Sequence, residues 1–127
     1  MLSLTPSASL RVLLCVAPTD MRRGFDTLAG MVRQHLGHDP LCGHLFVFRG
    51  RSGGRLKVLY WDRDGYALWQ KRLERGTFRF PDAGPASGGP APAAVEVSAA
   101  DLLMLLDGGD LASVRRGKRF ALPRQKT

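Results

Sequence analysis

The stretch from Gly43 to Pro81, GHLFVFRGRSGGRLKVLYWDRDGYALWQKRLERGTFRFP, decides the fold of this chain. Its two apolar runs, Leu45–Phe48 and Leu56–Trp61, flank a segment of glycines and arginines, Arg49–Arg55. Val, Phe and Tyr suit half-buried strands, and glycines allow the positive φ angles of a tight connection. The stretch therefore predicts an antiparallel hairpin with a solvated, cationic tip.

The residues after the hairpin predict a helix and then a short strand. Apolar side chains recur there at helical spacing, with Asp64 as the expected N-cap and Gly76 just past the helix end. Aromatic and polar residues then alternate over Phe78–Phe80, which predicts a strand that Pro81 ends. The apolar positions of the predicted helix are Tyr66, Trp69 and Leu73.

The residues before the hairpin predict a buried strand and a long helix. Leu10–Ala17 is almost wholly apolar, and Pro18 ends it. Thr19 is the expected N-cap of a helix that closes at Gly37 and packs on the sheet. Its apolar stripe consists of Met21, Phe25, Leu28, Val32 and Leu36.

Downstream of the hairpin the composition changes twice. Residues 81–94 are rich in Pro, Gly and Ala, which predicts a flexible loop. Ala94–Val97 is the expected last edge strand. Ser98 then caps an apolar helix over Ala99–Asp107, with Asp101 at the capping-box position.

Residues 1–127 are expected to form a single α+β domain, because this length suits one modest core. The predicted order is β-α-β-β-α-β(-β)-α, an antiparallel sheet with a central hairpin and helices on one face. Residues 1–9 are expected to be loose and 111–127 to form a basic tail. No apolar run approaches the roughly 18 residues that cross a bilayer, and no secretory signal precedes the domain, so a cytoplasmic location is expected.

Positive charge is concentrated in two blocks of a chain whose net charge is +8. Residues 45–80 hold nine lysines and arginines against three carboxylates, and residues 111–127 hold six against none. Residues 81–110 carry five carboxylates and no base. This asymmetry favours a polyanionic partner over the alternative that the arginines only keep the protein in solution.

The predicted nucleic-acid contacts come from both helices and the hairpin between them. Arg22 and Arg23 are expected in a first helical turn, where the helix dipole opposes positive charge. Either a phosphate at that helix start or an ion pair with Asp20 or Asp26 would offset this cost. The full predicted set is Arg49, Arg51, Arg55, Lys57, Lys71, Arg72, Arg75, Arg22 and Arg23.

Metal and stacking sites are weighed against plainer explanations. His35, His38, Cys42 and His44 could supply zinc ligands, but the stretch lacks a second well-spaced ligand pair and is typical of a simple loop. We therefore predict no metal, no cofactor and no catalytic residue. Four aromatic residues could stack on bases, although core packing is the preferred interpretation. They are Tyr60, Trp61, Tyr66 and Trp69.

Three blocks of the sequence resemble one protein family. They are Gly43–Pro81, TDMRRGFDTLAGMV at Thr19–Val32 and SAADLLMLLDG at Ser98–Gly108. Together they closely resemble the TnpB, or Orf2-like, accessory proteins of the sixty-sixth insertion-sequence family of bacterial transposable elements, over roughly residues 10 to 120. The resemblance implies a small protein encoded beside a transposase and associated with transposition, with no known catalytic residues.

The sequence and this resemblance together predict a non-enzymatic, DNA-binding accessory protein of insertion-sequence transposition and DNA recombination. Its expected partners are the DNA of the element ends and the transposase of the same element. In the alternative, an adaptor docks on the transposase without touching DNA, through Leu102, Leu103 and Leu106. A metal-dependent nuclease using Asp62 and Asp64 is a less favoured third possibility, because those residues fit a turn and a cap.

Overall fold

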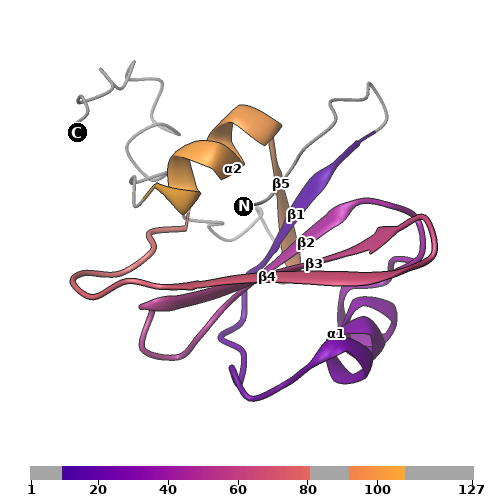
Figure 1. Ribbon diagram of the computed structural model, residues 1–127, viewed down its shortest axis with the longest axis horizontal. Coiled ribbons are helices and arrows are strands. Elements are labelled where there is room, and N and C mark those ends of the chain that lie inside the picture. Colours follow the sequence, from indigo (N-terminus) through magenta and orange to yellow (C-terminus); the bar gives the residue numbers. More distant parts are fainter. Residues whose placement is uncertain (1–9, 81–91, 108–127) are drawn as a thin grey trace.

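The computed structural model describes residues 10–80 and 92–107 (Figure 1). The predicted loose N-terminus, most of the Pro/Gly/Ala loop and the basic tail lie outside these residues. In chain order the elements are β1 (Val12–Cys15), α1 (Phe25–Met31), the π-helix η1 (Val32–Leu36), β2 (Leu45–Arg49), β3 (Arg55–Asp62), β4 (Gly65–Arg72), β5 (Ala94–Val97) and α2 (Ala99–Leu106). None of the described helices is long and apolar enough to span a membrane.

The five strands form one sheet in the order β4-β3-β2-β1-β5. The predicted hairpin is confirmed, since β2 and β3 pair antiparallel with Phe46 opposite Leu59. The expectation of an antiparallel sheet is corrected to a mixed sheet, because β1 and β2 run parallel. The reason is that the chain between them crosses over through α1 and η1, which returns β2 in the direction of β1.

The two helices cover opposite faces of the sheet, as Figure 1 shows. One core cluster contains Leu14, Val47 and the buried leucines of α2, and we call its side the α2 face. The other contains Leu13, Phe46 and Leu28 of α1, on the α1 face. The prediction of helices on one face is therefore corrected. All four residues of β1 are buried, which is the pattern of a strand covered on both faces.

The segment predicted as the second helix is the strand β4, and this expectation is wrong. Asp62 pairs with Gly65 across a two-residue turn, and the pairing continues along the strand to Arg55 and Arg72. Arg63 in that turn has φ 59°, the left-handed conformation that two-residue hairpin turns require. Asp64 therefore lies in a turn and caps no helix, because cross-strand pairing overrides the helical spacing of the apolar residues.

The short strand predicted over Phe78–Phe80 is absent from the strands of the sheet. Phe78 is nevertheless fully buried in the cluster on the α2 face. Its backbone N–H donates a 2.8 Å hydrogen bond to the carbonyl oxygen of Gly53 in the β2–β3 loop. The segment after β4 thus folds back over the tip of the central hairpin.

The first helix begins six residues later than Thr19, at Phe25, with Gly24 as its N-cap. Thr19 instead forms a parallel bridge with Gly50, so it continues the pairing of β1 with β2. The predicted helix end is confirmed at Gly37, whose φ of 70° is left-handed. At the other helix, the predicted cap is also confirmed, because the Ser98 hydroxyl accepts a 3.0 Å hydrogen bond from the backbone N–H of Asp101.

Candidate nucleic-acid interface

Four exposed arginines gather at the carboxyl ends of the parallel strands β1 and β2. The segment leaving β1 is fixed there, because the backbone N–H of Thr19 donates to the carbonyl oxygen of Arg49 at 2.9 Å. Ligands in sheets with parallel strands commonly bind just outside such carboxyl ends. We call the four arginines the basic rim, which consists of Arg22, Arg23, Arg51 and Arg55.

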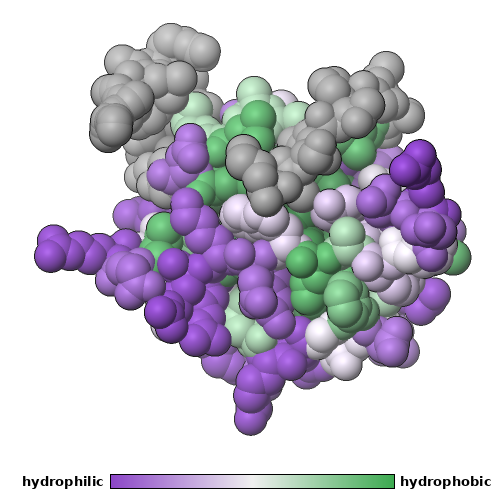
Figure 2. Space-filling view, viewed as in Figure 1, coloured by the Kyte–Doolittle hydropathy of each residue, from purple (hydrophilic) through white to green (hydrophobic). Residues whose placement is uncertain are grey.

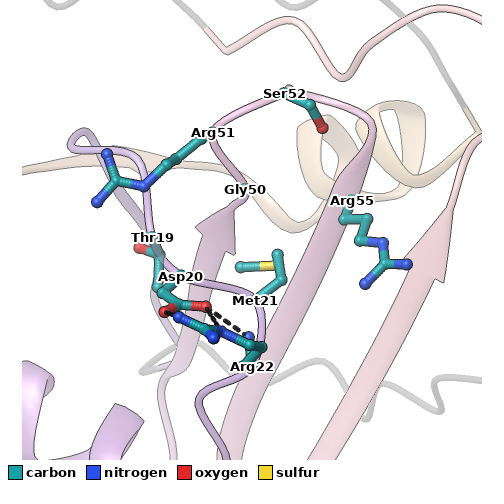
Figure 3. Close-up of a pocket in the computed structure, with 8 residues that line it drawn as sticks. All are labelled: Thr19, Asp20, Met21, Arg22, Gly50, Arg51, Ser52 and Arg55. Atoms are coloured by element: carbon teal, nitrogen blue, oxygen red, sulfur yellow. Dashed lines mark hydrogen bonds and ion pairs between the residues drawn. The ribbon is translucent and has the colours of Figure 1, made fainter.

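The β2–β3 loop and the segment after β1 border an open cavity of about 320 Å³ on the surface (Figure 3). Figure 3 shows Arg51 and Arg55 extending to either side of the loop, with Arg22 folded onto Asp20 below them. A second cavity of about 380 Å³ shares Arg51 and reaches Arg23 and His35. The first cavity is lined by Thr19, Asp20, Met21, Arg22, Gly50, Arg51, Ser52 and Arg55.

Arg22 and Asp20 form an ion pair within the rim. The arginine Nη2 lies 2.8 Å from Asp20 Oδ2, and the backbone N–H of Arg22 donates to Oδ1 at 2.9 Å. The guanidinium, helped by that N–H, holds the pKa of the Asp20 carboxyl well below its ordinary value. The structure therefore contains the ion pair that the sequence left as one of two alternatives. Arg22 and Arg23 both precede the N-cap Gly24, so neither lies in the first turn of α1, where the sequence predicts them.

Arg51 and Arg55 carry the positive charge of the hairpin tip. Within the described residues, neither side chain makes a hydrogen bond or an ion pair. Arg55 lies directly opposite Arg72 in the β3–β4 register, and like charges in that position repel. Only Arg72 is neutralised, by Glu74, whose Oε2 lies 3.0 Å from its Nη2. Among the described residues, the tip thus presents two arginines, Arg51 and Arg55, whose charges no carboxylate pairs.

Three of the predicted contact residues have structural roles instead. Arg49 donates to the carbonyl oxygen of Phe78 at 3.1 Å, and its guanidinium lies 4.3 Å from the ring centre of Phe80. Partial burial also lowers the Arg49 pKa. The ammonium groups of Lys57 and Lys71 each donate to a distant backbone carbonyl, at 2.7 and 2.6 Å. These contacts hold loops and helix ends onto the sheet, and each occupies one donor of its cation.

The sequence comparison places the chain in a family. Residues 10–116 match the family described as IS66 Orf2 like protein. The chain belongs to the IS66 Orf2-like family. It is therefore a transposition-associated accessory protein, as the resemblance in its sequence predicted.

Two proteins of Sinorhizobium fredii (strain NBRC 101917 / NGR234) are similar to this Orf2-like protein. The uncharacterized protein y4hO is 47% identical over 102 residues, which cover 80% of this chain and 83% of that protein. The uncharacterized protein y4jC is 39% identical over 111 residues, which cover 87% of this chain and 89% of that protein. No solved structure matches the chain.

The leucines predicted to contact a transposase differ in exposure. Leu102 and Leu106 of the Orf2-like protein are buried on the α2 face, at 0% and 7% exposure. Only Leu103 is exposed, at 47%. Two of the three predicted contacts are therefore corrected to core residues, because an eight-residue helix on a sheet must bury one face.

The possible metal ligands do not converge. The described residues contain no group of three or more His, Cys, Asp or Glu side chains that could hold a metal ion. His44 instead accepts a 3.2 Å hydrogen bond from the backbone N–H of Arg11 through Nδ1, and the ring of His38 lies 6.0 Å from that of Phe46. Asp62 ends β3 beside the β3–β4 turn and Asp64 lies in that turn, so the interpretation of Asp64 as a helix cap is wrong.

Most aromatic residues pack against the core, as the sequence favoured. Tyr60 and Trp69 contact the cluster on the α2 face, and Tyr66 contacts the one on the α1 face. Trp61 meets Tyr66 edge-on at 5.2 Å between ring centres. Ser52, which lines the first cavity, was not predicted from the sequence. Asp20 was predicted as one possible ion-pair partner, and only the structure shows that it pairs with Arg22 ahead of the helix.

Proposed function

We propose that this protein acts in insertion-sequence transposition as a non-enzymatic factor that binds nucleic acid through the basic rim. The observation that carries the proposal is that Arg22, Arg51 and Arg55 line one cavity at the carboxyl ends of β1 and β2. Arginine binds phosphate with several donors in a fixed planar arrangement, so three around one hollow suit a phosphodiester backbone. The proposed target is the DNA of the element ends.

Phosphate contact, rather than base reading, fits the geometry of the rim. Arg51 and Arg55 project from a glycine-rich loop whose Gly53 has a φ of +83°. Among the described elements, no helix or strand follows within this loop that could enter a groove, and contacts to phosphates do not by themselves read sequence. Binding is therefore expected to depend on charge far more than on sequence.

Four of the nine residues predicted to contact nucleic acid lie in the basic rim. Two others, Arg72 and Arg75, can extend this interface. Arg75 is exposed in the loop after β4, and Arg72 shares its charge with Glu74. Arg49, Lys57 and Lys71 are removed from the proposed interface, because each is held by a backbone carbonyl.

The test is a fluorescence-anisotropy titration of the full chain with a labelled duplex of an element end and with a scrambled duplex, at several salt concentrations. The double variant Arg51→Ala/Arg55→Ala should weaken binding to both duplexes alike. It should also reduce the slope of log K against log salt by about 2, one for each lost phosphate contact. The variant Arg51→Lys/Arg55→Lys should keep most of the slope, because it keeps both charges.

The matched control is Arg33→Ala, which removes an exposed arginine of η1 that lines neither cavity. Its salt slope should equal that of the unchanged protein. Because the control removes one charge and the rim variant two, a loss of slope about half as large in the control would mean that binding follows net charge alone. An unchanged slope in the rim variant would remove the basic rim as the interface.

One observation supports the alternative function as an adaptor for the transposase: the side chain of Leu103 on α2 is exposed. Co-purification of the full chain with the transposase in the presence of a nuclease tests it. If the adaptor function holds, Leu103→Asp should abolish capture while Arg51→Ala/Arg55→Ala leaves it intact. The reverse pattern would favour a contact that depends on the rim or on DNA.

A further inference from the structure

The sheet ends in two very different edges. One edge is β5, which has four residues, and the other is β4, which has eight and contains no proline. Among the described residues, no strand pairs with the outer side of β4. In Figure 1 β4 crosses the front of the sheet, and Figure 2 shows hydrophobic residues reaching the surface in the middle of the same view. A long unprotected edge is a template for pairing with another strand.

The backbone groups of β4 alternate between its neighbour and the open side. The N–H of Leu73, just after β4, donates to the carbonyl oxygen of Gly54 at 2.8 Å, so odd-numbered residues face β3. The even-numbered residues therefore present their N–H and C=O groups outward. They are Tyr66, Leu68, Gln70 and Arg72.

We propose that β4 pairs antiparallel with β4 of a second copy of this chain, centred on Leu68, so that one sheet continues across the dimer. The charges along the strand favour this partner. β4 follows the carboxylate of Asp64 and ends in Lys71 and Arg72. Antiparallel pairing centred on Leu68 sets Arg72 opposite Asp64 of the second copy, whereas in-register parallel pairing sets cation against cation.

The faces of the sheet select the register. A two-fold axis between antiparallel strands stands perpendicular to the sheet, so residues of equal parity lie opposite each other. With Leu68 on the axis, its outward N–H and C=O meet those of the twin Leu68, and Trp69 lies opposite Ala67 of the second copy. A large side chain thus meets a small one on the α2 face. The same axis reverses the strand direction in the second copy, so the two basic rims lie at opposite ends of the extended sheet.

The first test is sedimentation equilibrium of the full chain over a range of concentrations, which should show a reversible dimer. Gln70→Pro should give a folded monomer, because proline removes an outward N–H and is tolerated on an edge strand. Its fold is checked by circular dichroism. The matched variant Gln70→Thr keeps the N–H and should remain dimeric. A monomeric unchanged protein, or a dimer that survives Gln70→Pro, would overturn the proposal.

The second test fixes the register in a Cys42→Ser background, which removes the exposed thiol and leaves buried Cys15. Leu68→Cys should cross-link the dimer on mild oxidation. Hydrogen-bonded antiparallel pairs have Cα atoms about 5.5 Å apart, within the range that a disulfide spans. Gln70→Cys is the control, since the twin residues would lie about 13 Å apart along the strands and should not cross-link. Cross-linking of Gln70→Cys but not of Leu68→Cys would contradict the pairing.

Discussion

The ammonium group of Lys57, in the middle of the sheet, lies 2.7 Å from the backbone carbonyl oxygen of Arg23. Lys57 is 7% exposed, while Arg23 is exposed on the basic rim. A buried lysine thus holds in place the segment that carries two of the rim arginines. The fixed cation supports the site from within the sheet, while the neighbouring arginines offer their charge to solvent.

Lys57→Ala should therefore lower the free energy of unfolding and leave the salt dependence of DNA binding unchanged. Losing a hydrogen bond to a charged donor costs about 1.5–3 kcal/mol, and urea unfolding should show that decrease. The salt slope of DNA binding should stay the same, because Lys57 offers no donor to a phosphate. Arg55→Ala is the opposite control, with stability retained and a shallower slope. A shallower slope for Lys57→Ala with unchanged stability would contradict this assignment.

Trp69→Ala should lower the free energy of unfolding by about 2–3 kcal/mol, less than for a fully buried Trp, because the ring packs on the α2 face from an edge strand. Trp61→Ala is the comparison, since its main partner is the edge-on ring of Tyr66, and about 1 kcal/mol is expected. Denaturant midpoints measure both. A loss of affinity for single-stranded DNA without a loss of stability would instead favour base stacking by Trp69.

His44 should make folding stability depend on pH. Burial, reinforced by the nearby charge of Arg11, lowers the His44 pKa below its ordinary value of 6.5, although Glu96 opposes this. Below about pH 6.5 the unfolded chain binds a proton at His44 more readily than the folded chain does. The contribution of His44 to folding stability is therefore fully present above about pH 6.5 and declines as the pH falls toward the folded pKa. His38 also faces His44 and acts in the same direction as Arg11.

His44→Asn should flatten that decline, because its amide oxygen can still accept the N–H of Arg11 but does not titrate. Thermal midpoints between pH 7 and 5 give the measurement. The carboxylates of Asp20 and Glu96, whose pKa values are lowered by arginines, lose their contribution only at lower pH, near and below 3.8 and 4.5. A midpoint that depends on pH equally in both proteins would exclude His44 as the titrating group.

The two cysteines should react very differently with a thiol reagent. Cys42 is exposed and should be modified at once, whereas Cys15 is 3% exposed in β1 and donates to the carbonyl oxygen of Ala17. Burial also raises the Cys15 pKa, which reduces the reactive thiolate. One thiol per chain should therefore react rapidly in the native protein, and the second should react only when the protein unfolds. Rapid reaction of both would show that the second cavity, which Cys15 also lines, admits the reagent.

The sequence by itself determined the elements whose causes are local. The β2–β3 hairpin follows from apolar runs around a glycine-rich loop, and both are neighbours in the chain. The end of the first helix at Gly37 and the start of α2 at Ser98 depend on single residues whose conformation or hydroxyl completes a helix terminus.

Only the tertiary structure decided between strand and helix over Gly65–Arg72. Apolar residues there fit both periods, and pairing with β3 through the turn at Arg63 selected the strand. Tertiary structure likewise separated rim arginines from structural cations. Arg49, Lys57 and Lys71 are held by carbonyl oxygens 29, 34 and 35 residues away, and no local pattern encodes such partners. Charge can be counted along a chain, but its availability depends on what the fold brings next to it.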